Sequence, residues 1–385
     1  MIGNMIEYVH SYGFFDFNAL PFSAVDALVL AQFVYLKMDG IVDGFIPGAR
    51  PITLKEMRAH PRAEHLFADT RFEENNRALF HAMCESKRFG EMKCIYCADH
   101  ICVENETQFM AVTCIFPDGS VKVLYRGTDE TIIGWKEDFN MAFQYPIPGQ
   151  QSSQLYLEQV AGNVSAGFDL IGHSKGGNLA VYAAMHVAER VQKRIGSIYN
   201  LDGPGFRTEV YRMGYFEKIS DRIVKIIPRS SIVGMILENH GAYRVVDSKS
   251  IGFLQHDPYS WLIDRIDFVY VEHMDETHRI MDESLNNWVM SLPKEEVSAF
   301  VNALYQIVAA SEATDLISFT KNWTKSLAGM AGAIQNLDEE TKNSIYRVMK
   351  SLANASRERL KEETENYIQN KIEGLTNQLI RKEGP

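Results

Sequence analysis

The string FDLIGHSKGGNLAVYAAM constrains this chain more than any other part of its sequence. Glycines at 172 and 176 flank Ser174, with an apolar run before them and a run rich in alanine and valine after them. We expect a buried strand over 168–172 and a helix over 175–190, joined by a turn that only small neighbours permit. Such a turn holds the serine in a strained backbone conformation and lifts its hydroxyl above the sheet. The context therefore predicts a nucleophile at Ser174, against the alternative of a chance match.

The neighbouring segments alternate between strand and helix patterns. Ser23 is a candidate N-cap for an apolar helix over 24–37, and residues 50–90 have a charged, helical pattern. Turn residues at 117–120 join two strands in a hairpin. Strands that alternate with helices indicate a mostly parallel sheet covered by helices, whose chemistry gathers at the carboxyl ends of the strands. Besides 168–172, the expected strands are 108–116, 121–125, 196–201, 222–227 and 243–246.

The pattern changes again near residue 280, where strand patterns cease. Apolar side chains recur at helical spacing in three later segments, 297–308, 345–352 and 368–379. We therefore expect an α/β domain over residues 1–278 and a helical extension over 279–385. The extension is too apolar to remain in water, so it forms either a cap on the domain or a homodimer contact.

Composition limits the partners and the compartment. With 39 basic and 50 acidic residues the net charge is −11, which argues against nucleic acid as a partner. No run approaches the ~20 apolar residues of a membrane span, and the N-terminus lacks the pattern of a signal peptide. The five cysteines crowd residues 84–114 and are odd in number, which indicates reduced thiols and a cytoplasmic protein.

Cys94 and Cys97 raise the question of a zinc site. No second cysteine pair follows at zinc-finger spacing, and the strand pattern around them places the two side chains on opposite faces. We therefore expect neither a metal nor a cofactor.

A serine needs a base to act as a nucleophile, and the base needs an acid to orient it. In a strand–turn–helix site of this kind, the chain order is serine, acid, histidine. Asp202, in YNLDGPGF, ends the next predicted strand, and His256, in FLQHDPYSW, follows the last one. Asp202 has the alternative role of a turn former, and His256 that of a structural loop histidine. We predict a Ser174–His256–Asp202 triad, with the main-chain amide of Lys175 facing the oxyanion. His173, inside the motif, we interpret as a packing residue.

Five strings carry a resemblance to a known family: PFSAVDALVLAQFVYL, QFMAV, RGTDETIIGWKEDFNMAF, GHSKGGNLAVYAA and QHDPYSW. Over residues 20–265 the chain resembles the bacterial Mbeg-like family, an α/β-hydrolase group catalogued as a domain of unknown function. The strings YRGTDETIIGWKEDF and GHSKGGNLA are also similar to those of class 3 lipases, which are triacylglycerol lipases. The resemblance implies an α/β-hydrolase fold, Thr128 as an oxyanion-hole residue and Asp138 as an acid that braces its loop.

The chain departs from class 3 lipases at the acid. Those lipases place it after the following strand, in an Asp-x-Val-Pro type string, whereas the corresponding run here, PRSSIVGMIL, has Ser231 at that position. LDGPGF resembles the LDPAGP string of pancreatic-type lipases, which carry the acid on the earlier strand. That resemblance favours Asp202, with Asp247 as the reserve candidate and Glu238 as the third.

These patterns lead to one expected activity and two alternatives. We expect a serine esterase that cleaves carboxylic, lipid-like acyl esters through an acyl-enzyme, with a small-molecule ester as its substrate. An acyltransferase would use the same site but deliver the acyl group to an alcohol or amine. A catalytically silent α/β-hydrolase scaffold would act through its helical extension. The missing aspartate at 231 favours the scaffold, and the intact GHSKGG string opposes it.

Overall fold

The computed structural model describes residues 2–274, except 69, 103, 105, 130–133, 135, 136 and 139. The predicted helical extension over 279–385, with its role as a cap or a homodimer contact, lies outside the described residues.

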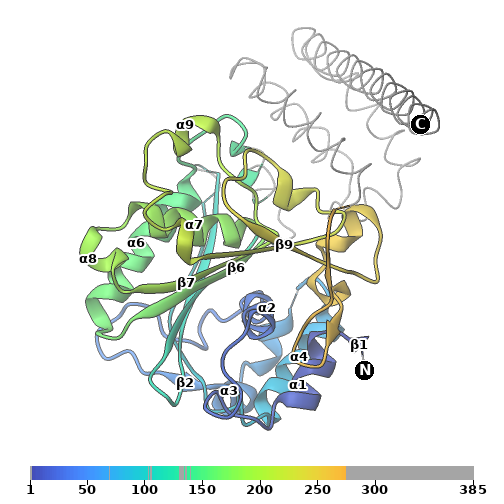
Figure 1. Cartoon of the computed structure of the whole chain (residues 1–385). Coiled ribbons are helices and arrows are strands. Elements are labelled where there is room, and N and C mark those ends of the chain that lie inside the picture. Colours follow the sequence, from blue (N-terminus) through green and yellow to red (C-terminus); the bar gives the residue numbers. More distant parts are fainter. Residues whose placement is uncertain are drawn as a thin grey trace, which may run out of the picture.

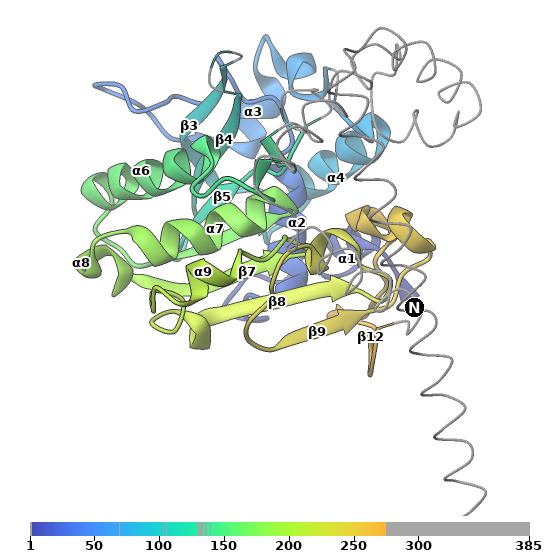
Figure 2. The ribbon, with the colours of Figure 1, turned by 90° about the horizontal axis from the view of Figure 1, so that it is seen from above.

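A nine-stranded mixed sheet forms the centre of the described chain (Figure 1), in the order β12-β9-β8-β7-β6-β5-β4-β3-β2. The run from β5 to β9 is parallel, the strands from β2 to β5 pair antiparallel, and β12 pairs antiparallel with β9. Figure 2 shows the strands following one another from β3 to β12. The strands are β2 (Ile52–Thr53), β3 (Lys93–Cys102), β4 (Thr107–Ile115), β5 (Val121–Tyr125), β6 (Phe168–His173), β7 (Ile195–Leu201), β8 (Ile223–Pro228), β9 (Tyr243–Val246) and β12 (Tyr270–Val271).

Helices cover both faces of this sheet, and each face has its own hydrophobic core. Side chains alternate along the strands, so Ile171 of β6 packs with α1, α2 and α4, while the adjacent Leu170 packs with α6 and α7. Figure 1 shows α6, α7 and α8 on one side of the sheet and α1 to α4 on the other. The helices are α1 (Met5–Tyr12), α2 (Ala24–Phe33), α3 (Leu54–Ala59), α4 (Glu73–Glu85), α6 (Pro148–Asn163), α7 (Lys175–His186), α8 (Glu189–Gln192) and α9 (Thr208–Tyr211). This is the α/β-hydrolase fold that the sequence predicts.

Short elements complete the described chain. A three-stranded antiparallel sheet joins β1 (Ile2–Gly3), β10 (Ile263–Asp264) and β11 (Asp267–Phe268). Single turns of 3₁₀ helix lie in the connections: η1 (Ala63–Phe67), η2 (Ser220–Arg222), η3 (Val233–Met235), η4 (Gly252–His256) and η5 (Pro258–Ser260). Among the helices within the described ranges, none is long and apolar enough to cross a membrane.

The predicted elements differ from the observed ones mainly in helix length. The hairpin of β4 and β5 is confirmed. The predicted helix over 175–190 is two helices, because Val187 adopts an extended backbone (ψ 156°) between α7 and α8. The helical pattern over 50–90 is also divided, since His60 is extended ahead of Pro61, as a residue before proline usually is. Beyond Phe33, the predicted helix continues only as tight turns, in which Tyr35 N–H donates to Gln32 O.

The parallel strands end at one edge of the sheet, and their following loops hold the residues of interest. Ser174 follows β6, Asp202 follows β7, Ser231 comes after β8, and Asp247 follows β9. The fold therefore gathers these side chains from distant parts of the sequence at the carboxyl ends of the strands.

Asp26 of α2 forms hydrogen bonds with a residue of α1 and with a residue that follows α4. Its carboxylate accepts a hydrogen bond from Ser23 N–H over 2.8 Å, as part of a capping box at the start of the helix. Arg88 Nε donates to Asp26 Oδ1 over 2.6 Å, and Tyr8 Oη donates to the same oxygen over 2.9 Å. The Arg88 and Asp26 side chains are both fully buried, so each charge depends on the other.

We therefore predict that Asp26→Asn lowers the free energy of unfolding by about 3–5 kcal/mol, because it leaves the Arg88 guanidinium buried without a counter-charge. Urea denaturation measures the change. Lys87→Met is the matched control: Lys87 pairs with Asp16 on the surface, and loss of an exposed pair should leave stability almost unchanged. Equal losses in the two variants would contradict the importance of the buried pair.

Candidate active site

Ser174 lies in a sharp turn between β6 and α7. Its backbone angles are φ 57° and ψ −134°, a conformation that costs a non-glycine residue free energy. Two glycines make the turn possible. A Cβ on Gly172 would lie 2.1 Å from the main chain of Gly176, and a Cβ on Gly176 would lie 2.2 Å from Tyr125 O. The main chain of Ser174 is held by a 2.9 Å hydrogen bond to Leu201 O.

A chain of hydrogen bonds joins the three residues of the predicted triad. His256 Nε2 lies 2.9 Å from Ser174 Oγ, and His256 Nδ1 lies 2.6 Å from Asp202 Oδ2. A carboxylate only accepts, so Nδ1 carries the ring proton and Nε2 is free to accept from the serine hydroxyl. The carboxylate of Asp202 is fully buried, where a charge requires partners. The structure thus brings together residues 54 and 82 positions apart in the chain.

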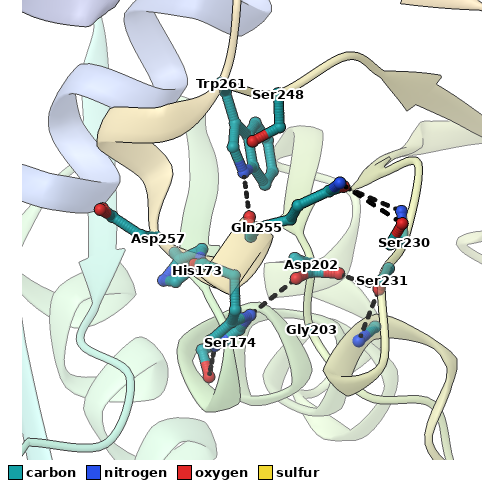
Figure 3. A network of polar contacts seen from close by, with 12 residues as sticks. His173, Ser174, Asp202, Gly203, Ser230, Ser231, Ser248, Gln255, Asp257 and Trp261 are labelled. Atoms are coloured by element: carbon teal, nitrogen blue, oxygen red, sulfur yellow. Dashed lines mark hydrogen bonds and ion pairs between the residues drawn. The ribbon is translucent and has the colours of Figure 1, made fainter. Parts of the chain in front are cut away.

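Ser231 contacts the second oxygen of the same carboxylate. Its hydroxyl donates to Asp202 Oδ1 (Figure 3) and accepts from Gly234 N–H over 3.1 Å. Gly234 has no room for a side chain, because a Cβ there would lie 2.2 Å from Asp202 Oδ1. The residue at the acid position of class 3 lipases therefore supports Asp202 in this chain.

The two other candidate acids have different partners. Asp247 Oδ1 accepts from Arg229 Nη1 over 3.3 Å and from Ser248 N–H over 2.9 Å. Glu238 accepts from the Thr208 hydroxyl and lies 3.3 Å from His240 Nε2. Of the three candidates, the one that contacts His256 is Asp202.

The Lys175 side chain forms an ion pair that the sequence analysis did not anticipate. Its ammonium lies 2.8 Å from Glu137 Oε2 and also donates to Gln108 O and Oε1, over 3.0 and 2.8 Å. Both side chains are almost completely buried. Glu137 also accepts from Gly149 N–H over 2.7 Å. The only hint in the sequence was the lysine itself, because a charge inside a buried turn requires a counter-charge.

Thr128 and Asp138 contact each other beside this pair. The Thr128 hydroxyl donates to Asp138 Oδ2, as the resemblance implies for a braced loop. Burial raises the pKa of Asp138 to about 6, although the Lys175 charge and the Thr128 hydrogen bond oppose that shift. The main chain at Gly127, just before Thr128, runs close to Ser174, since a Cβ on Gly127 would lie 3.1 Å from Ser174 Cβ. Thr128, Lys175 and Ser174 therefore belong to one site.

Comparison with known families bears on the whole of this region. The sequence pattern of the Mbeg1-like family matches residues 83–306, which is more than half of the chain. The chain belongs to the Mbeg1-like family. The family match begins at residue 83, within α4, whereas the resemblance seen in the sequence begins at residue 20. The match ends at residue 306, beyond the end of that resemblance at residue 265.

Other comparisons add little to the Mbeg1-like assignment. One solved structure, titled "Crystal structure of M37 lipase", is similar over 56% of this chain and 70% of that chain, with 14% identity and a TM-score of 0.34. The comparison with curated proteins gave no match. Within the parts of the Mbeg1-like chain that are described, no three His, Cys, Asp or Glu residues are grouped to hold a metal ion.

The Lys175–Glu137 pair connects the turn at Ser174 to the loop of Thr128. Glu137→Gln should lower the free energy of unfolding by about 3–5 kcal/mol, because the Lys175 ammonium stays buried without a counter-charge. The double variant Lys175→Met, Glu137→Gln removes that charge and should recover part of the loss. Glu158→Gln is the control, because Glu158 is exposed on α6. A double variant less stable than Glu137→Gln alone, measured by urea denaturation, would contradict this account.

Proposed function

We propose that this Mbeg1-like chain is a serine hydrolase that cleaves carboxylic esters through an acyl-enzyme. The observation that carries the proposal is the hydrogen-bonded chain Ser174–His256–Asp202, with distances of 2.9 and 2.6 Å. A serine hydroxyl becomes nucleophilic at neutral pH when a neighbouring base accepts its proton. The strained turn presents this hydroxyl at the N-terminus of α7, where the helix favours negative charge.

In the first step, Ser174 Oγ forms a bond to the ester carbonyl carbon while its proton moves to His256 Nε2. The carbonyl π electrons move onto the oxygen, and the buried Asp202 carboxylate stabilises the imidazolium that forms. Collapse of this intermediate breaks the bond to the leaving alcohol, which takes the proton from His256. Water then repeats the sequence on the acyl-enzyme, which releases the carboxylic acid and restores the serine.

We assign the oxyanion hole to the main-chain amides of Lys175 and Thr128, because the Thr128 hydroxyl already donates its proton to Asp138. Lys175 follows the nucleophile, where the amide faces a developing oxyanion in this kind of turn. The Gly127 main chain passes beside Ser174, which brings Thr128 to the same side of the site. The Lys175–Glu137 ion pair would keep the two donors in fixed relative positions, as transition-state stabilisation requires.

The substrate class that we propose is an ester with an apolar acyl group. Two apolar side chains on the loop that leads to His256 are exposed, Ile251 by 80% and Leu254 by 46%. Both residues lie within five positions of His256 in the chain, and exposed apolar side chains beside a reactive group favour an apolar ligand over a polar one. Transfer of the acyl group to an alcohol or amine shares every step up to the acyl-enzyme, and product analysis distinguishes it from hydrolysis.

Ser174 should be the serine that reacts strongly with an activity-based fluorophosphonate label. Ser174→Ala should abolish labelling and reduce the turnover of p-nitrophenyl esters by on the order of 10⁶-fold, since the nucleophile is lost. Mass spectrometry of the labelled peptide measures the first effect. Ser165→Ala is the control, because that serine is exposed and should not affect labelling. Unchanged turnover in Ser174→Ala would reject the proposed function.

The acid can be tested separately. Asp202→Asn should lower kcat by about 10⁴-fold, because an amide in place of the carboxylate stabilises the wrong tautomer of His256. Asp247→Asn is the matched control and should have a far smaller effect, because that carboxylate pairs with Arg229. If steady-state kinetics gave the reverse ranking, the acid would lie on the later loop.

A further inference from the structure

His173, which precedes the serine, makes polar contacts with both of its ring nitrogens. It is only 4% exposed at the end of β6, and its ring centroid lies 4.6 Å from that of His256. Its Nε2 lies 3.0 Å from the main-chain carbonyl oxygen of His256, and its Nδ1 lies 3.2 Å from Tyr35 Oη. The sequence predicts a packing role for this residue, and these contacts give it a second role.

The contacts determine which nitrogen of His173 carries the proton. A carbonyl oxygen only accepts, so Nε2 must donate to it. Burial and the nearby His256 hold the pKa of His173 well below its usual value, so the ring is neutral and Nδ1 has no proton. Nδ1 therefore accepts from the Tyr35 hydroxyl, whose own pKa is raised by burial. The direction of donation runs from Tyr35 to His173 to His256.

Tyr35 also touches the loop on the other side of Ser174. A Cβ on Gly127 would lie 2.1 Å from Tyr35 Oη and 3.1 Å from Ser174 Cβ, so the hydroxyl fills the space that a side chain would need. Tyr35 comes from the tight turns that follow α2, on the opposite side of the sheet from α7. One hydroxyl thus connects the support of His256 with the loop that leads to Thr128.

The main chain at His256 is held at two consecutive carbonyls. Trp261 Nε1 donates to the Gln255 carbonyl over 2.8 Å (Figure 3). His173 donates to the next carbonyl, that of His256. The Gln255 side chain accepts from Ser230 N–H over 2.9 Å, next to the serine that supports Asp202. Buried ring N–H groups therefore fix the backbone from which the His256 imidazole projects.

We propose that Tyr35 and His173 are positioning residues for His256. They form a neutral relay that fixes the main chain of His256, so that its imidazole faces Ser174, and they join it to the loop of Thr128. We assign neither residue a part in the making and breaking of bonds, so neither is a catalytic residue. The inference rests on the proposed function for the role of His256, but the relay itself is a property of the folded chain.

Two substitutions of His173 separate the relay from packing. His173→Gln keeps an amide N–H that donates to the His256 carbonyl and an amide oxygen that accepts from Tyr35, whereas His173→Leu fills similar space without polar atoms. We expect His173→Leu to lower kcat by about 10²-fold with KM nearly unchanged, because loss of these hydrogen bonds displaces the His256 imidazole by up to about 1 Å. His173→Gln should recover most of that loss. If packing alone mattered, His173→Leu would be at least as active as His173→Gln, and that result would overturn the proposal.

Tyr35→Phe tests the other end of the relay. Alone it should lower kcat by about 10-fold, a smaller loss than that of His173→Leu. In the His173→Leu background it should cost nothing further, because residues that act through one another are non-additive. Additive losses would show that the two residues act independently and would overturn the relay.

A measurement without turnover keeps this proposal distinct from the proposed function. In protein labelled with ring-¹⁵N histidine, the resonances lost in His173→Gln identify His173. They should report the neutral, Nε2-protonated ring from about pH 5 to 8, with a changed Nδ1 shift in Tyr35→Phe. Titration of His173 near its usual pKa of about 6.5 would overturn the relay. If the spectra showed this tautomer of His173 but Ser174 did not react with the fluorophosphonate label, the proposed function would be wrong, and with it the positioning role.

Discussion

The close approach of β6 to α7 is the constraint on which the site depends. Where the two elements meet, Gly172 and Gly176 leave no room for a Cβ, and the chain turns so sharply that Ser174 takes φ 57°. Strain of this kind costs about 1–3 kcal/mol and persists only where the surrounding structure holds it. Both elements are buried along almost their whole length, β6 between its two parallel neighbours and α7 against them. The strain is therefore offset by packing that comes from the fold as a whole.

Buried charges explain why the loops around Ser174 are tied to one another. Asp202, Lys175 and Lys225 are all withdrawn from water, and an isolated charge there would be very costly. Asp202 is satisfied by His256 and Ser231, and Lys175 by Glu137. Burial lowers the pKa of Lys225 to about 7, and its side-chain nitrogen donates to the carbonyls of Gly203 and Gly234, over 3.1 and 2.8 Å. The partners of each buried group come from a different loop. Because these groups need their partners once they are removed from water, the contacts hold the loops of the site in place.

The sequence predicted those features that depend on neighbours in the chain. The strand, turn and helix around Ser174 follow from local periodicity and small residues, and Asp202 could be proposed because it ends a strand. The preference for Asp202 over Asp247 came from the resemblance to pancreatic-type lipases and not from local pattern, since the acid depends on which loop lies against His256. The break at Val187, the partner of Lys175 and the Tyr35–His173 contact also escaped prediction. The last of these joins residues 138 positions apart, and no periodic pattern reports such a distance.

The serine at position 231 is consistent with Asp202 as the acid of the proposed mechanism. Its hydroxyl lies against Asp202 Oδ1, within a site where that carboxylate is already fully buried. A second carboxylate at 231 would put two like charges in contact, and one of them would have to hold a proton. A protonated or displaced Asp202 would no longer orient His256 as the proposed mechanism requires. An acid directly after β7 and an acid after β8 therefore exclude each other. If Asp202 is the acid, position 231 suits a small residue that donates a hydrogen bond to it.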